Sequence, residues 1–187
     1  NPMYPPRGFF RGYFTYLAER GYARRTVARR VAALRSFFRY WAQIENEDNP
    51  AQQLRSPKLK RTLPVFLSEE QVQALLQAPN KKTPQGLRDA CILELLYSTG
   101  CRVSELVNLN VEDLNLSTGC ARVQGKGRRE RVVLIGEPAQ LVTMDYLSWA
   151  RPQLTRTKAG PQQALFLNRL GTRLTDRSVR RLINKHT

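Results

Sequence analysis

Two short motifs contain the side chains of this sequence that could do chemistry on a phosphate. The first is Thr99–Leu106, read TGCRVSEL, in which Arg102 follows a turn and precedes a helix-forming segment. A guanidinium at such a junction is held by the core beneath it and presents a planar fork to a phosphate, and Glu105 is close enough in sequence to orient it. The second motif is Gly125–Gly127, whose glycines permit a sharp turn from which Lys126 projects. Such an ammonium could reach into a groove and donate a proton.

Other chemistries for these residues are less well supported. A lone arginine after a Thr-Gly turn is usually a capping residue, and a GKG sequence is usually only a tight turn, so the order of the two motifs carries the argument. Lys126 is followed by Gly127 rather than by Ser or Thr, which removes the magnesium-binding hydroxyl of a phosphate loop. A metal-dependent nuclease is disfavoured because Glu112 and Asp113 are adjacent rather than convergent and His186 is the single, nearly terminal histidine. We expect no metal and no cofactor.

The elements that must position these motifs are mostly helical. Residues 87–99 are apolar on most sides, which predicts a buried helix that ends at Gly100, and a second helix begins near Ser104. The segments ARVQ and RVVLI flank GKGRRE, which predicts a β-hairpin with a cationic tip. Further helices are expected over 68–79, where Ser68 and Gln71 resemble a capping box, over 139–150 and from 176 onward, with a short apolar run at 164–167.

The charge of the chain points to a polyanionic partner. Its 187 residues include 31 Lys and Arg against 15 Asp and Glu, a formal net charge of +16. A field of that sign concentrates polyanions at the surface, so we expect a nucleic acid, with a membrane surface as the ordinary rival. Residues 1–62 hold 13 basic and 4 acidic residues and residues 63–187 hold 18 and 11, so the excess is shared.

Three further features of composition place the chain among ordinary folded proteins. The hydrophobic fraction of 41% is typical of a folded domain. The three cysteines lack CxxC spacing and indicate neither a disulfide framework nor a zinc site. No segment resembles a signal peptide or a membrane-spanning run, so we expect a cytoplasmic protein without membrane contact.

The N-terminal segment predicts a basic helical unit. Residues 9–42 read as two helices broken at Gly21, and in the second helix apolar residues at helical spacing alternate with six arginines. A merely solvated face is the ordinary alternative, but arginines without interspersed glutamates argue against it. Prolines and basic residues from Asn49 to Pro64 predict an extended linker. We therefore expect a helical DNA-binding domain over 1–50, a linker over 51–64 and a mainly helical domain with a small β-hairpin or sheet over 65–187.

The expected DNA contacts are basic side chains from all three segments, and most should bind phosphates. They are Arg24, Arg25, Arg29 and Arg30 in the first domain, Lys58, Lys60 and Arg61 in the linker, and Arg128 and Arg129 on the hairpin, with Arg173, Arg177 and Arg180 as weaker candidates.

Along nearly its whole length the chain resembles the Xer branch of the tyrosine recombinases, a family that also includes phage integrases. The resemblance is carried by TGCRVSELVNLNVEDLNL and GKGRRERVVLIG, preceded by NPAQQLRSPKLKRTLPVFLSEEQVQALL and ARRTVARRVAALRSFFRYW. It implies a helical core-binding (SAM-like) domain and the N-terminal part of a mixed α/β catalytic domain, together closing like a clamp around double-stranded DNA. Arg102 matches the first catalytic arginine of the family, and Lys126 matches its hairpin lysine.

The resemblance also implies a reaction. In such enzymes a tyrosine attacks the scissile phosphate and leaves a 3′-phosphotyrosyl link and a free 5′-hydroxyl, without metal or cofactor. Arg102 would neutralise the charge on the non-bridging oxygens, a role worth about 3–4 kcal/mol per well-placed donor. Lys126 would protonate the leaving 5′-oxygen, helped by like-charge repulsion from Arg128, Arg129 and Arg131. Second recombinase protomers, forming a tetramer on paired sites, are expected partners.

The sequence departs from the family pattern at its end. The motif with a histidine and a second arginine, and the nucleophilic tyrosine, would lie beyond Thr187, and Tyr97 and Tyr146 are expected to be core residues. We therefore expect the chain as given to bind DNA without cutting it. Chromosome dimer resolution, a role in chromosome partition and cell division, is preferred over phage or mobile-element integration. A non-catalytic DNA-binding module with the same clamp is the alternative.

Overall fold

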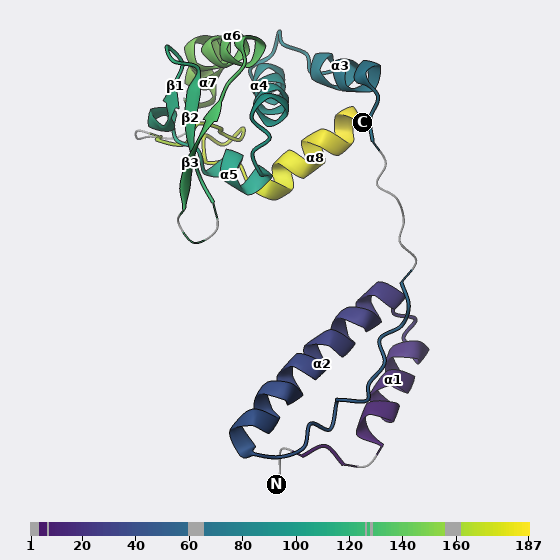
Figure 1. Ribbon diagram of the computed structural model, residues 1–187. Helices are drawn as coiled ribbons and strands as arrows, with labels where there is room; N and C mark the ends of the chain where they lie inside the picture. Colours follow the sequence, from purple (N-terminus) through teal and green to yellow (C-terminus); the bar gives the residue numbers. More distant parts are fainter. Residues whose placement is uncertain (1–3, 7, 60–65, 126, 128, 156–161) are drawn as a thin grey trace. The chain divides into compact units, whose positions relative to one another are not determined.

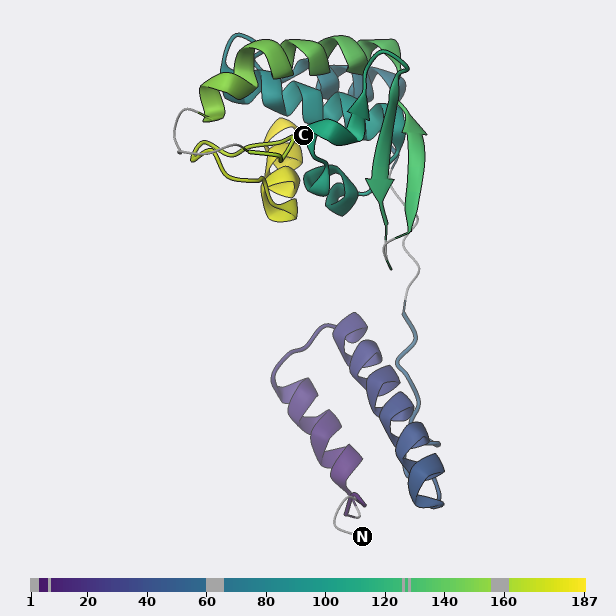
Figure 2. The same ribbon diagram turned by 90° about the vertical axis from the view of Figure 1, so that its left-hand side faces the viewer.

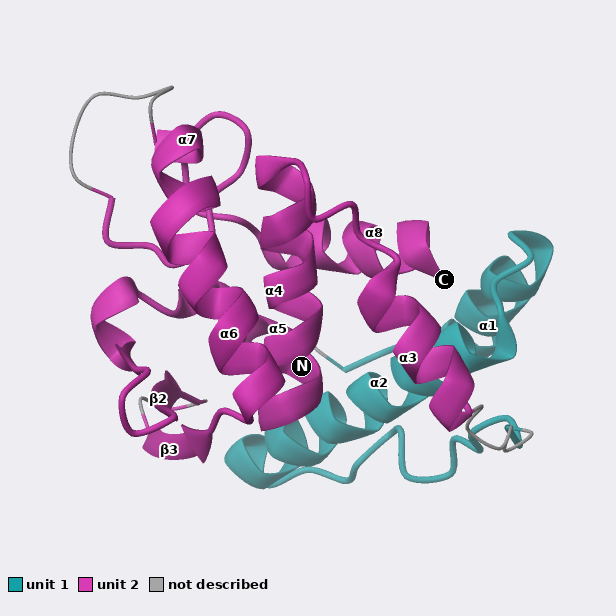
Figure 3. Cartoon of the chain, turned by 90° about the horizontal axis from the view of Figure 1, so that it is seen from above, with its two compact units in different colours: residues 1–65 teal, residues 66–187 magenta. Residues whose placement is uncertain are grey.

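A computed structural model describes residues 4–6, 8–59, 66–125, 127, 129–155 and 162–187. The chain divides into two compact units, residues 1–65 and 66–187, coloured separately in Figure 3. The expected fold class, mainly helical with a small antiparallel sheet, is confirmed. Within the described ranges, no helix has the length and hydropathy needed to cross a membrane.

Unit 1, residues 1–65, contains two helices that lie side by side in Figures 1 and 2. Helix α1 spans Phe9–Glu19 and α2 spans Arg24–Glu45, with Gly21 at a φ of 64° in the turn between them. The ring centroids of Phe10 in α1 and Phe38 in α2 are 5.4 Å apart, so these side chains pack the two helices together. Apolar side chains of α2 bury one face, as its spacing predicts.

The chain after α2 continues to pack on unit 1. Ala51 is fully buried against Phe38 and Trp41, and Leu54 packs against the same cluster. The first residues of the segment expected to be a linker therefore belong to this core. The domain boundaries expected from the sequence otherwise stay a prediction.

Unit 2, residues 66–187, combines helices with one small sheet (Figure 1). Its elements are α3 (Glu69–Gln77), α4 (Pro84–Thr99), α5 (Val103–Asn108), a 3₁₀ turn (Val111–Asp113), β1 (Leu114–Asn115), β2 (Cys120–Gln124), β3 (Glu130–Leu134), α6 (Glu137–Asp145), a π-helical turn (Tyr146–Ala150), α7 (Arg151–Thr155) and α8 (Asp176–His186). The strands pair antiparallel in the order β1-β2-β3, with Val123 opposite Arg131. The hairpin predicted around GKGRRE is thus confirmed.

Helix α4 is the central element of unit 2 and contacts α3, α5, α6, α8 and β3. Thr83 caps its start by accepting from the backbone N of Gly86 at 3.1 Å. Gly86 admits no side chain, because a Cβ there would lie 1.9 Å from the carbonyl oxygen of Asn80. At the other end Gly100 has a φ of 59°, which turns the chain toward α5. The helix therefore holds the following residues on a rigid base.

Two tyrosines expected in the core behave differently. Tyr146 is fully buried, stacks on Phe166 at 5.5 Å and donates to the carbonyl of Leu165 at 3.0 Å, as expected for a core residue. The expectation for Tyr97 is wrong, because its side chain is 65% exposed. Leu93, one turn earlier on the same face of α4, is buried, so the cover of this face ends before the last turn.

The capping box predicted at the start of α3 is confirmed. The backbone N of Ser68 donates to Oε1 of Gln71 at 2.8 Å, and the backbone N of Gln71 donates to Oγ of Ser68 at 3.3 Å. Two orphan amides of the first turn are therefore satisfied by side chains.

Candidate active site

Arg102 stands at the start of α5, directly after the turn that ends α4. Its backbone N donates to Oε2 of Glu105 at 2.8 Å, and its Nη1 donates to Oε1 of the same carboxylate at 2.9 Å. The side chain is nevertheless 74% exposed. The backbone of Arg102 is thus fixed by its local hydrogen bond while the guanidinium faces solvent, as a phosphate-binding group requires.

Glu105 is the buried centre of this arrangement, with a side chain only 1% exposed. The guanidinium of Arg131 grips it as a fork, with Nη1 to Oε1 at 2.8 Å and Nη2 to Oε2 at 2.9 Å. The hydrogen bonds from Arg131, first among several causes, lower the pKa of Glu105 to about 2, against the opposing effect of burial. Glu105 is therefore ionised at neutral pH and joins α5 to β3.

Sequence reasoning missed this role of Arg131, which was considered only as a neighbour of the hairpin lysine. A signal was present in the alternation of the strand. Because side chains alternate along a strand, Arg131, Val133 and Ile135 share one face. Val133 and Ile135 pack that face against the hydrophobic core of unit 2. An arginine on the inward face of a strand needs an acidic partner to compensate its charge. The partner, Glu105, lies 26 positions away in the sequence, so local patterns did not reveal it.

The base of the hairpin loop lies against the same carboxylate. The backbone N of Gly125 donates to the carbonyl of Arg129 at 2.7 Å and closes the loop. A Cβ at Gly125 would lie 3.4 Å from Oε1 of Glu105. Lys126 and Arg128 fall outside the described residues, so the catalytic role expected for Lys126 stays a prediction. The residue that precedes Lys126 nevertheless borders the group that holds Arg102.

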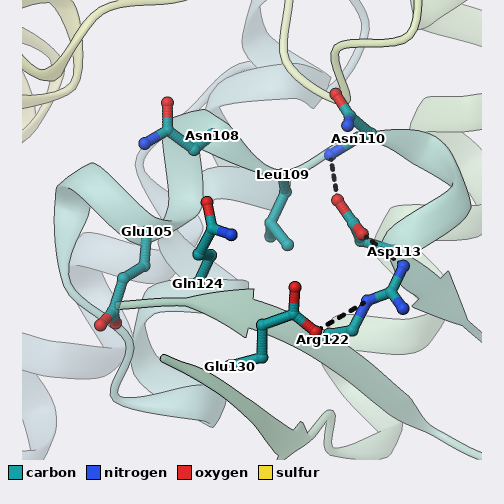
Figure 4. A pocket seen from close by; sticks show the side chains of 8 residues that line it. All are labelled: Glu105, Asn108, Leu109, Asn110, Asp113, Arg122, Gln124 and Glu130. Atoms are coloured by element: carbon teal, nitrogen blue, oxygen red, sulfur yellow. Dashed lines mark hydrogen bonds and ion pairs between the residues drawn. The ribbon is translucent and has the colours of Figure 1, made fainter. Parts of the chain in front are cut away.

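A pocket of about 160 Å³ opens beside this centre (Figure 4). Arg122 lines the pocket, with its Nη2 3.3 Å from Oδ1 of Asp113 and its Nε 4.0 Å from Oε2 of Glu130. Carboxylates therefore outnumber the guanidinium here, which makes the pocket a poor site for a phosphate. The guanidinium of Arg102, in contrast, is exposed to solvent. The pocket is lined by Glu105, Asn108, Leu109, Asn110, Asp113, Arg122, Gln124 and Glu130.

Unit 1 presents a cationic face along α2. At about 100° per residue, five of its arginines fall within an arc of roughly 140° around the helix axis. All five are exposed, and the sequence places no acidic residue in α2 before Glu45. The face comprises Arg24, Arg25, Arg29, Arg35 and Arg39. The exposed basic face that the arginine spacing predicted is confirmed, and its contact with DNA phosphates stays a prediction.

Arg30 lies off this arc and has a different role. Its Nη1 donates to the hydroxyl of Tyr13 at 3.1 Å, and its guanidinium lies 4.3 Å from the ring centroid of Tyr22. The hydrogen bond to Tyr13 raises the pKa of Arg30. Arg30 therefore joins α2 to Tyr13 of α1 and to Tyr22 of the turn. Because its guanidinium is engaged there, we expect no DNA contact from Arg30.

The remaining predicted contacts divide in the same way. Four of them are exposed, namely Lys58, Arg129, Arg177 and Arg180, and their contact with DNA stays a prediction. Lys60 and Arg61 fall outside the described residues. Arg173 uses Nη1 to donate to the carbonyls of Val107 at 2.8 Å and Leu109 at 3.0 Å, which closes the C-terminal end of α5. The guanidinium of Arg173 thus stabilises the fold, and we expect no DNA contact from it.

The sequence and the fold of the chain have counterparts in known proteins. Residues 65–187 match the model of the phage integrase family. The chain belongs to this family. One curated relative is the tyrosine recombinase XerC of Pelotomaculum thermopropionicum, which is 44% identical to the chain over 180 residues. The aligned residues make up 95% of the chain and 59% of the relative. The tyrosine recombinase XerD of Listeria innocua is 41% identical over 165 residues, 88% of the chain and 55% of the relative.

Solved structures show the same fold. The XerA recombinase aligns with this phage integrase chain at a TM-score of 0.55 and 22% identity, covering 96% of the chain and 59% of XerA. The Tn1549 transposon integrase, solved in complex with circular intermediate DNA, aligns at a TM-score of 0.65 and 18% identity, covering 96% and 63%. The assignment to the tyrosine recombinases, with Xer proteins as relatives, is confirmed, and the chain spans less than two thirds of the length of these proteins.

Proposed function

We propose that this chain supplies the DNA-binding unit and the first part of the catalytic centre of a tyrosine-type site-specific recombinase. One observation carries the proposal: the exposed guanidinium of Arg102 is tethered to a buried carboxylate, Glu105, that also anchors the base of the hairpin through Arg131. A cation whose backbone is fixed and whose guanidinium is exposed, beside a glycine-closed loop, is the arrangement that a phosphodiester cleavage site needs. Family membership supports the same conclusion.

The proposed reaction is an exchange of phosphodiester partners. A tyrosine oxygen attacks the phosphorus and forms a 3′-phosphotyrosyl bond, while the bond to the 5′-oxygen breaks and that oxygen takes up a proton. Arg102 neutralises the charge that develops on the non-bridging oxygens, and Lys126 delivers the proton. Tyr146 is not the nucleophile, because it is buried, its hydroxyl is hydrogen-bonded to Leu165, and burial raises its pKa. From the resemblance to the family, we propose that the nucleophile is a tyrosine that the full-length protein carries outside residues 1–187.

The proposed partner is double-stranded DNA, bound by both units. The five arginines of the α2 cationic face, Lys58 and Arg129 contact phosphates and set the position of the DNA. In the complete protein, four protomers act on two paired sites. We propose chromosome dimer resolution as its role, ahead of phage or mobile-element integration; the relatives named tyrosine recombinase XerC and XerD support a site-specific recombinase of the Xer type.

The test is whether the complete protein forms a covalent adduct with DNA. Duplexes that bind this chain are first enriched from a random pool, and the full-length protein is then incubated with them. The expected product is a heat-stable protein–DNA adduct with a free 5′-hydroxyl on the released strand, which polynucleotide kinase labels directly. Ends that carry a 5′-phosphate would contradict the proposal. Tight binding without any adduct would favour the alternative, a non-catalytic DNA-binding module.

A further inference from the structure

The fork that Arg131 makes with Glu105 has a consequence for the proposed reaction, on which it rests. We propose that Arg131 is a positioning residue: it neutralises Glu105, so that the guanidinium of Arg102 is free to leave this carboxylate and bind the DNA phosphate. Arg131 itself need not touch DNA. It acts on Arg102 through the carboxylate that the two arginines share.

Glu105 needs hydrogen-bond and charge partners because it is buried. A carboxylate that is 1% exposed stays ionised only if hydrogen bonds and opposite charge replace its water. Among the described residues, its donors are Nη1 and Nη2 of Arg131 and the backbone N and Nη1 of Arg102. If Nη1 of Arg102 departs, the other three donors remain in place. The buried carboxylate then keeps both a charge partner and hydrogen bonds to each oxygen.

The two arginines bind Glu105 differently. Arg131 makes two parallel hydrogen bonds, whereas the side chain of Arg102 makes one. Bidentate pairs are stronger and more directional than single hydrogen bonds. The side chain of Arg131 is 43% exposed and that of Arg102 is 74% exposed, so water and a phosphate reach Arg102 more readily. Arg102 is therefore the partner that can move.

Removal of Arg131 would alter the partners of Glu105. Glu105 would then keep a single charge partner, Arg102, and would hold its guanidinium more firmly. The DNA phosphate would have to compete with a buried carboxylate for the same group. Cleavage would slow although Arg102 is still present. Binding of the duplex would change little, because it rests on many other cations.

The experiment compares single-turnover cleavage rates of the full-length protein, with protein in excess over DNA. Arg131→Gln is expected to slow cleavage by about 10- to 100-fold, the scale of effect of a misplaced catalytic group. Arg131→Lys keeps the charge without the fork and is expected to lie between this variant and the wild type. The matched control is Arg122→Gln, on the neighbouring strand, whose side chain is 56% exposed and pairs with Asp113. It is expected to stay within about twofold of the wild type, as most surface substitutions do.

Two further readouts separate positioning from a loss of stability. Removal of Arg131 raises the pKa of Glu105, and protonation of Glu105 then releases Arg102. The rate of Arg131→Gln relative to the wild type should therefore increase as the pH falls. The double variant Glu105→Gln with Arg131→Gln removes the competing carboxylate and should cleave faster than Arg131→Gln alone. Unfolding curves are measured to check that each variant is folded at the assay temperature. If Arg131→Gln is unfolded there, the rates of Arg131→Lys and the wild type are compared instead.

The outcomes distinguish this inference from the proposed function. If the wild type forms no adduct, the proposed function fails. If the wild type cleaves, Arg102→Ala does not, and Arg131→Gln matches Arg122→Gln, only the positioning role of Arg131 is wrong. A rate ratio that does not change with pH, together with a double variant no faster than the single one, would also overturn it.

Discussion

At the scale of single residues, Glu105 links acid stability to the candidate site. Its pKa is about 2 in the folded unit and 4.5 ordinarily, so the folded state binds fewer protons there than the unfolded chain. The stability that this difference contributes is present above pH 4.5 and is lost as the pH falls toward 2. We predict that Glu105→Gln loses less free energy of unfolding between about pH 5 and pH 2.5 than the wild type, measured by urea denaturation. Parallel losses in the two proteins would show that Glu105 is not the responsible group.

The two tyrosines of unit 2 give a second test at this scale. Tyr146→Phe removes a buried hydroxyl that donates to the carbonyl of Leu165, and should lower the free energy of unfolding by about 1–3 kcal/mol. Tyr97→Phe is the matched control, because its side chain is 65% exposed, and should stay within about 0.5 kcal/mol. Thermal or urea unfolding of the two variants measures the difference. Equal effects would contradict the assignment of one tyrosine to the core and one to the surface.

At the scale of elements, α2 carries exposed arginines on its cationic face and one arginine, Arg30, that holds the fold. Arg29 lies on the cationic arc, whereas Arg30 is bonded to Tyr13 and covers Tyr22. Arg29→Gln should reduce the slope of log affinity against log salt by about 0.9, the value of one lost phosphate contact on duplex DNA. Arg30→Gln should leave that slope unchanged and lower the melting temperature of unit 1. An equal loss of slope in both variants would place Arg30 at the DNA after all.

The elements themselves were largely predictable from local patterns, and their long-range partners were not. The capping box at Ser68, the hairpin around GKGRRE and the buried helix before Gly100 follow from local turn, cap and periodicity signals. The fork of Arg131 on Glu105 joins residues 26 positions apart, which periodicity alone cannot pair. For the same reason Arg173, which caps α5 from 66 positions away, looked like a free cation.

Local patterns also fail where packing stops within an element. Tyr97 comes four residues after the buried Leu93 of α4, yet its side chain is 65% exposed, although the adjacent Ser98 accepts a hydrogen bond from the backbone N of Gly136. Ala51 follows a proline in a segment that reads as linker, but its small side chain fits under Phe38 and Trp41. Burial at both positions depends on the lengths and placement of neighbouring elements, which the residues themselves do not encode.

At the scale of the whole molecule, binding and cleavage draw on different groups. The net charge of +16 is spread over both units, +9 in residues 1–65 from 13 basic and 4 acidic residues and +7 in residues 66–187 from 18 and 11. The proposed affinity for DNA is therefore expected to be shared among many phosphate contacts, each a small part of the total. The proposed stabilisation of the transition state, in contrast, is concentrated on Arg102 and its partners around Glu105.

The measurement that tests this account most directly is cleavage and binding by Arg102→Ala in the complete protein. We predict a loss of about 10²–10³-fold in the rate of adduct formation, the usual effect of removing one donor to a developing oxyanion. The affinity for the same duplex should stay within a few-fold of the wild type, measured by mobility shift. Adduct formation within a few-fold of the wild-type rate would contradict the central claim that Arg102 acts on the scissile phosphate.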